Sequence, residues 1–138
     1  MKICVITDIH SNVFALRAAL AEIDRIKPDK IVCLGDIVGN GAYPEETVQL
    51  IKSRKDITCV CGNHDFIVLA DLEKFSKEDV RLKGFKWQQR VLSTNSKEFL
   101  SGLKKEYRFT AEGLRVVCFH YPKKGGRFKE LIYLPTEE

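Results

Sequence analysis

The segment ICVITDIH, residues 3–10, decides the fold class, because an apolar strand-like run ends in a carboxylate and an imidazole. Three further segments repeat this plan: KIVCLGD at residues 30–36, VCGNHD at residues 60–65 and RVVCFH at residues 115–120. Short continuous apolar runs are typical of strands buried in a sheet. In an open α/β sheet, side chains just past the carboxyl ends of the strands face one shared crevice. We therefore expect the polar ends of the four segments to converge.

Helical patterns separate the first three apolar runs. After the first run, Ser11 or Asn12 can cap a helix whose apolar positions recur at helical spacing, and Pro28 ends it. Pro44 suits the first position of a second helix, and residues 57–61 form a third strand. This strand–helix–strand–helix–strand order predicts parallel pairing with right-handed crossovers.

The second half of the chain has a different pattern. Residues 65–105 are predicted to be mainly helical, and residues 107–110 and 114–120 to form a hairpin around a short turn. The helical part has four expected buried anchors, which are Phe85, Trp87, Val91 and Leu92. We expect residues 1–138 to form one domain, since this length fits a single hydrophobic core.

Composition excludes several classes of protein. The 138 residues are 44% hydrophobic and 30% charged, with a net charge of +4, and no clustered basic stripe supports nucleic-acid binding. No run reaches the roughly 20 apolar residues of a membrane span, and the first apolar stretch is too short for a secretory signal. The five cysteines lie in strand-like runs and form no Cys-x-x-Cys pair, which favours core packing over a redox or soft-metal role. We expect a reduced, cytoplasmic protein.

Two strand ends carry carboxylates at informative positions. Asp8 and His10 are two residues apart, so both side chains can turn to the same side. Asp36 lies between Gly35 and Gly39, which let the backbone turn tightly beside a ligand. Each feature alone has a structural explanation, such as an aspartate that caps a turn. Together, imidazole and carboxylate suit first-row divalent metals.

The other two strand ends add an amide and two imidazoles. Asn63 can ligate a metal through its carbonyl oxygen, His64 can face a substrate, and Asp65 can hold the other nitrogen of His64. His120 alone would more often be structural. The combination of all four strand ends makes a metal site the better interpretation.

The sequence carries four motifs in a fixed order: Asp-x-His from Asp8, Gly-Asp-x-x-Gly from Gly35, Gly-Asn-His-Asp from Gly62, and a lone His120. This order resembles that of the calcineurin-like metallophosphoesterases, in their prokaryotic predicted phosphoesterase branch. The resemblance covers residues 1 to about 122. It implies an α/β fold, a layered α/β/β/α sandwich, here with a shortened second sheet. It also implies hydrolysis of a phosphate monoester or diester by a metal-activated water at a dinuclear site.

The resemblance assigns roles residue by residue. It implies five metal ligands, which are Asp8, His10, Asp36, Asn63 and His120. Asp8 and His10 would hold the first ion, Asn63 and His120 the second, and Asp36 would bridge them. The two divalent ions could be manganese, iron, nickel, cobalt or zinc, and manganese is the first choice. His64, with Asp65 as its partner, would contact the scissile phosphate and protonate the leaving group.

One motif of the family is absent from this sequence. No histidine follows His120, so the final Gly-His-x-His motif is missing and each ion would lose one protein ligand. Three interpretations stay open: a phosphoesterase that functions with five ligands, a half-site completed by a second copy in a homo-oligomer or by another chain, or a degenerate relative that binds metal or phosphate without turnover. A flavodoxin-like or receiver-type module would explain Asp8 and Asp36 but would leave the amide and imidazoles without a purpose.

Overall fold

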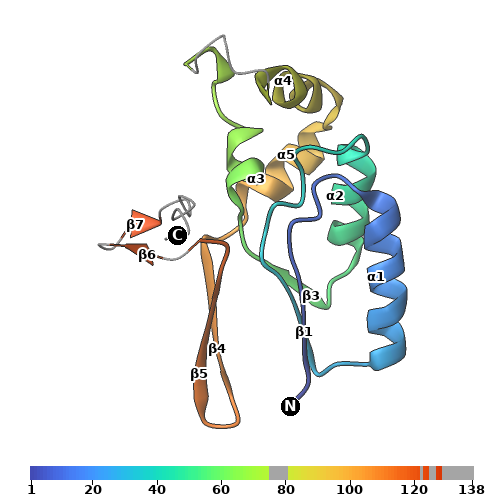
Figure 1. Cartoon of the computed structure of the whole chain (residues 1–138), viewed down its shortest axis with the longest axis vertical. Helices are drawn as coiled ribbons and strands as arrows, with labels where there is room; N and C mark the ends of the chain where they lie inside the picture. Colours follow the sequence, from blue (N-terminus) through green and yellow to red (C-terminus); the bar gives the residue numbers. More distant parts are fainter. Residues whose placement is uncertain (75–80, 122, 125–126, 129–138) are drawn as a thin grey trace, which may run out of the picture.

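Three parallel strands form the first sheet of the computed structural model, which describes residues 1–74, 81–121, 123–124 and 127–128 (Figure 1). Their spatial order is β1 (Ile3–Ile6), β2 (Lys30–Cys33) and β3 (Ile57–Cys59). Val32 pairs with Val5 on one side and with Thr58 on the other. The predicted parallel pairing is confirmed, and the strands are shorter than the apolar runs.

Helices α1 (Val13–Ile26) and α2 (Pro44–Ser53) connect these strands and cover the same face of the sheet (Figure 1). The Asn12 side chain accepts a hydrogen bond from the Ala15 N–H at 3.0 Å and caps α1, so Asn12 is the cap. Lys27 ends α1 in the left-handed conformation, directly before Pro28. Strands that follow one another in one direction across a sheet need right-handed crossovers on one face, as observed here.

The apolar core lies between this sheet and the two helices. Ile31 and Cys33 of β2 are buried against Leu16 of α1 and Val48 of α2. These positions follow the period of two for strands and of 3.6 for helices, because each element buries one face. The core continues to the helices of the second half of the chain through Leu100.

The second half of the chain is helical, as predicted. Its elements are α3 (Asn63–Ile67), the 3-10 turn η1 (Leu72–Lys74), α4 (Arg81–Val91) and α5 (Thr94–Ser101). Two expected anchors, Phe85 and Leu92, are 7% and 3% exposed. The other two are corrected by the structure: Trp87 is 38% exposed and Val91 is 40% exposed. Positions 85 and 92 share the buried face of the helical stretch, whereas 87 and 91 point away from it.

Strands β4 (Glu106–Ala111) and β5 (Leu114–Phe119) form the predicted hairpin. The hairpin lies on the side of the first sheet away from α1 and α2 (Figure 1). Lys30 connects it to β2, because its ammonium donates to the Tyr107 hydroxyl at 3.2 Å and lies 5.0 Å from the centre of the Phe109 ring. The second sheet is small, as expected, and Val5 of the first sheet is 53% exposed.

Two short elements follow the hairpin: β6 (Lys123–Lys124) and β7 (Arg127–Phe128), which pair antiparallel. Among the described residues, no helix is both long enough and apolar enough to cross a lipid bilayer.

Candidate metal centre

The loops that follow β1 and β2 run side by side and bring their polar residues together. The Asp8 N–H donates to Gly35 O at 3.1 Å, and the His10 N–H donates to Asp36 O at 2.9 Å. Ser11 continues this ladder with a bond of 2.9 Å to Ile37 O. The pairing of the two strands therefore extends past their ends, and it places both loops at one edge of the sheet.

Backbone strain is concentrated in these two loops. Asp8, His10, Ser11 and Asp36 all have positive φ angles, between 48° and 59°. This left-handed region costs a residue with a side chain on the order of 1 kcal/mol or more, and it persists only where neighbouring contacts impose it. The loop-to-loop hydrogen bonds supply those contacts. Strain of this kind is common at functional sites.

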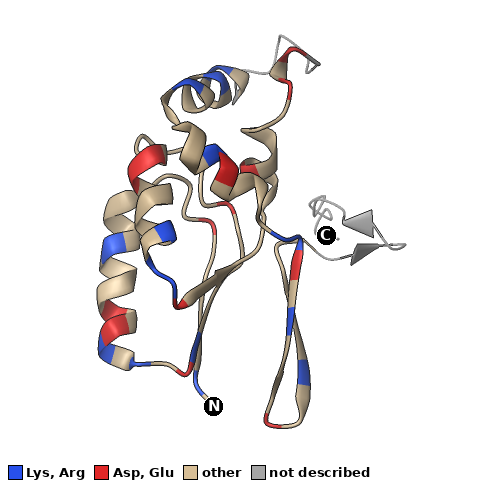
Figure 2. Ribbon diagram, turned by 180° about the vertical axis from the view of Figure 1, so that it is seen from behind, with Lys and Arg blue, Asp and Glu red and all other residues tan. Residues whose placement is uncertain are grey.

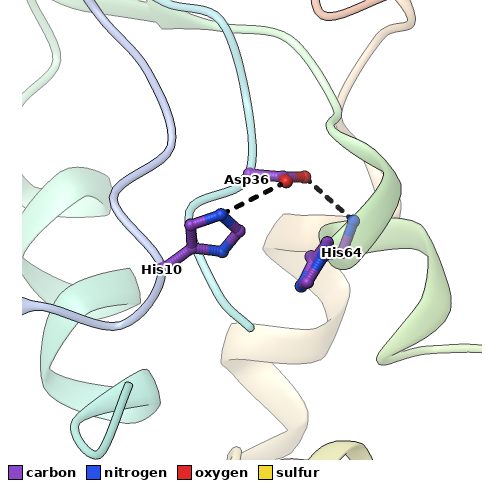
Figure 3. A group of neighbouring side chains, drawn as sticks. All are labelled: His10, Asp36 and His64. Atoms are coloured by element: carbon purple, nitrogen blue, oxygen red, sulfur yellow. Dashed lines mark hydrogen bonds and ion pairs between the residues drawn. The ribbon is translucent and has the colours of Figure 1, made fainter. Parts of the chain in front are cut away.

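A first cluster of side chains that could hold a metal ion consists of His10, Asp36 and His64, whose nitrogen and oxygen atoms lie within 4.8 Å of one another (Figure 3). His10 Nε2 is 3.7 Å from Asp36 Oδ2, and the backbone N–H of His64 donates to Asp36 Oδ1 at 2.9 Å. His10 Nδ1 lies 3.3 Å from Val38 O. A proton on Nδ1 leaves Nε2 with a free lone pair toward Asp36, as a metal ligand needs.

A second cluster consists of Asp8, Asp36 and His120, again within 4.8 Å. His120 Nε2 is 3.4 Å from Asp36 Oδ2, and His120 Nδ1 is 2.8 Å from Leu34 O. Both histidines therefore turn Nδ1 to a backbone carbonyl and Nε2 to the same carboxylate. The Asp36 carboxylate belongs to both clusters, and its side chain is only 4% exposed.

The Asn63 side chain lies against the same carboxylate. In one orientation its amide nitrogen donates to both Asp36 oxygens at 3.1 Å and to His120 Nε2 at 3.3 Å. In the other orientation its carbonyl oxygen faces these three acceptor atoms. The first orientation satisfies these atoms by hydrogen bonds, whereas the second turns the carbonyl oxygen toward the position that a cation between these groups would take. The carboxylates and imidazoles gathered here fit a divalent metal, and the role of Asn63 as an oxygen ligand stays a prediction.

Residues 1–137 match the calcineurin-like phosphoesterase superfamily domain. The chain belongs to this superfamily. The resemblance seen in the sequence motifs is therefore confirmed.

The relatives of this superfamily member include proteins about twice as long. An uncharacterized protein of Methanocaldococcus jannaschii is 38% identical over 135 residues, which cover 95% of this chain and 54% of that protein. A metallophosphoesterase from Sphaerobacter thermophilus is 31% identical, with a TM-score of 0.63, over 78% of this chain and 43% of that one. The chain spans about half the length of the relatives it matches.

A hypothetical protein from Pyrococcus horikoshii has the same fold, with a TM-score of 0.75 at 23% identity, over 84% of this chain and 53% of that one. This similarity bears on the fold alone. Together with the superfamily match over residues 1–137, it confirms the α/β metallophosphoesterase fold, and the second sheet of the present chain is small.

Electrostatic interactions link Asp36 and His120 in this domain. Burial raises the pKa of Asp36, but hydrogen bonds to His120 and to the His64 backbone outweigh it, so the pKa lies below its usual value. The hydrogen bond to Asp36 raises the pKa of His120. The pair therefore favours a carboxylate beside a proton-bearing imidazole, and a metal cation would compete with that proton.

Asp65 is fully buried and joins two loops of the centre. Its Oδ1 accepts the Val38 N–H at 3.0 Å, and its Oδ2 accepts the Gly62 N–H at 3.0 Å. Burial raises the pKa of Asp65 to about 6, although the two backbone N–H groups act in the opposite direction. Its partnership with His64 stays a prediction, and its backbone contacts show that it also organises the loops around Asp36.

Gln88 is a residue of the centre that the sequence patterns did not single out. It lies on α4, is 1% exposed, and accepts the Gly39 N–H at 2.9 Å. The sequence does contain a signal for the burial of Gln88. Residues 85, 88 and 92 share one helical face, and a polar residue between two buried apolar ones at that spacing signals a buried hydrogen bond.

Two hollows flank the clusters. One of about 490 Å³ is lined by Asp8, His10, Asn40 and Tyr43, among others. Another of about 170 Å³ lies beside Asn63 and His120. Small molecules can therefore reach the clusters from both hollows, as a ligand-binding site requires.

Gly35 provides a stability test of this architecture. Its φ is +97°, and a Cβ there would lie 2.3 Å from the Gly62 backbone nitrogen. Gly35→Ala is expected to lower the free energy of unfolding by about 3 kcal/mol, through the strained φ and the clash with backbone. Gly84→Ala, in the open interior of α4, is the matched control and should raise it by about 0.5–1 kcal/mol. Urea denaturation of both variants measures these changes. Equal destabilisation of the two variants would contradict this prediction.

Proposed function

We propose that this chain is a metal-dependent phosphoesterase that hydrolyses a phosphate monoester or diester at a dinuclear centre. The observation that carries the proposal is the buried Asp36 carboxylate, which is shared by two imidazole-containing clusters. A carboxylate in that position can neutralise the repulsion between two nearby dications. Manganese is the first choice of metal, and iron, nickel, cobalt and zinc suit the same ligands.

In this proposal, five residues hold the metals: Asp8, His10, Asp36, Asn63 and His120. Asp8 and His10 hold one ion, Asn63 and His120 the other, and Asp36 bridges them. Bound divalent ions supply Lewis acidity toward a water molecule and toward the phosphoryl oxygens. The Nδ1 atoms of His10 and His120 contact Val38 O and Leu34 O, and these contacts orient both Nε2 atoms toward Asp36.

His64 is proposed to contact the phosphate and to protonate the leaving group, with Asp65 as its partner. The His64 ring lies 4.6 Å from the ring of His10 and 5.1 Å from the ring of Phe85. Phe85 is buried, so it holds one side of the imidazole against apolar surface. A proton donor fixed in this way, beside the metal ligands, is what general acid catalysis needs.

The charge of the surroundings suits an anionic substrate. Helix α4 carries basic residues and no acidic one, as its ribbon shows (Figure 2). Gly39 to Ala42 form one wall of a hollow of about 340 Å³ whose other wall is Phe85 and Trp87 of this helix. Positive potential near a phosphate site raises the local concentration of phosphate esters.

A second candidate is a half-site that another chain completes. Its support is that the motifs of these 138 residues supply five ligands for two ions, while the relatives are about twice as long. A second copy of the chain could supply the further ligands. The third candidate, a relative that binds metal without turnover, has the same support.

The three candidate functions are distinguished by measuring hydrolysis of bis-p-nitrophenyl phosphate with manganese over a wide range of protein concentration. A self-sufficient enzyme gives a rate proportional to protein concentration, and chelator abolishes it. A rate that rises faster than protein concentration indicates a shared site. Manganese binding without turnover at any concentration would refute the proposed enzyme and leave a binding protein.

A further inference from the structure

Gln88 of α4 contacts both loops that carry the proposed metal ligands, although it is not a ligand itself. Its Oε1 accepts the Gly39 N–H at 2.9 Å and the Ser11 hydroxyl at 3.4 Å. Its Nε2 donates to Gly41 O at 3.2 Å. The side chain is 1% exposed, so these bonds form away from solvent, where each one constrains its partners strongly.

The backbone that Gln88 holds is in contact with two imidazole rings. A Cβ at Gly39 would lie 2.5 Å from His64 Nδ1 and 2.7 Å from His10 Nδ1, which shows how closely the rings approach this residue. A shift of Gly39 would therefore displace one or both rings. Ser11, the other contact of Gln88, directly follows His10 in the chain.

The same helix also contacts the centre one turn earlier. The Phe85 ring lies 5.1 Å from the His64 ring and is buried. Phe85 and Gln88 are three residues apart, so they lie on one face of α4. An element from outside the three-stranded sheet thus reaches the centre through two side chains.

We propose that Gln88 is a positioning residue, which clamps the loop at residues 39–41 to the loop after β1 and so fixes the imidazoles of His10 and His64. The inference rests on the proposed metal-binding function of these loops. Residues that orient ligands in this way typically contribute about 10–100-fold to metal affinity.

The test compares Gln88→Met with Gln89→Met. Methionine matches the length of glutamine but makes none of its hydrogen bonds. Gln89 is the matched control, because it lies next on the same helix and donates to Ala70 O at 2.8 Å, outside the ligand loops. Three quantities are measured for each: the hydrogen exchange rate of the Gly39 amide without metal, the manganese dissociation constant, and kcat with KM for bis-p-nitrophenyl phosphate.

In Gln88→Met we expect at least tenfold faster exchange of the Gly39 amide, at least tenfold weaker manganese binding, and a lower kcat at saturating manganese with KM within twofold. Gln89→Met should leave all of these near the wild-type values. Unchanged Gly39 exchange, or manganese affinity equal in the two variants, overturns the clamp. If the wild-type protein binds manganese but hydrolyses no ester, the proposed enzyme is contradicted and the clamp is not. The exchange rate of the Gly39 amide and the manganese dissociation constant do not depend on turnover.

Discussion

Asp36→Asn is expected to lower the affinity for manganese at least 100-fold and to abolish hydrolysis. The Asp36 carboxylate is shared by both ligand clusters and is nearly buried, so its charge has no substitute in either cluster. Asparagine has the same shape and keeps an oxygen for the His64 N–H. We therefore expect the free energy of unfolding in chelator to change by no more than about 1 kcal/mol. Isothermal titration with manganese and urea denaturation measure the two effects.

Asp24→Asn is the matched control for this experiment. Asp24 is an exposed carboxylate near the end of α1 that pairs with Arg54 and belongs to neither ligand cluster, and its substitution changes the net charge by the same amount. Its manganese affinity should equal that of the wild type. If Asp36→Asn binds manganese as tightly as Asp24→Asn does, the bridging carboxylate is wrong and the two clusters are not one centre.

His64→Gln is expected to lower kcat about 100-fold or more while leaving manganese affinity within a few-fold of the wild type. The physical reason is that a general acid acts on the leaving group in the transition state and is not needed to hold the ions. The loss should be greater for phenyl phosphate than for p-nitrophenyl phosphate, since the poorer leaving group depends more on protonation. Steady-state kinetics on both esters, with manganese titration, measures this difference.

The leaving-group comparison serves as the internal control for His64. The alternative is that His64 is a metal ligand, because its imidazole belongs to a cluster with His10 and Asp36. In that case His64→Gln would weaken manganese binding as much as it weakens catalysis, and the loss would be equal for both esters. That outcome would remove His64 from its proposed role as the proton donor.

The order of elements in the first half of the chain was determined by the sequence alone. Its apolar runs end in polar residues and are separated by helical patterns. This order predicts a parallel sheet with helical crossovers. That arrangement already places Asp8, Asp36 and Asn63 at one edge, because the carboxyl ends of parallel strands share it. The local periods of two and 3.6 residues suffice for this inference, since they depend only on which face is buried.

In the second half of the chain, the sequence pattern did not predict correctly which residues of α4 are buried. Trp87 and Val91 were expected in the core and are partly exposed, while Gln88 between them is buried. Apolar character alone does not say which face of a helix packs inward. The docking of α4 on the loops of the centre decides it, since Gln88 finds backbone partners there that offset the cost of its burial.

The sequence by itself thus determined the fold class, the family and the strand ends that carry the polar residues. Tertiary structure alone decided that the Asp36 carboxylate belongs to both clusters, that Asp65 binds the backbone of Gly62 and Val38, and that α4 supplies Gln88. The physical reason is the range of the contacts. Strand and helix patterns arise between residues close in the chain, whereas hydrogen bonds between buried groups depend on loops and helices that only folding brings together.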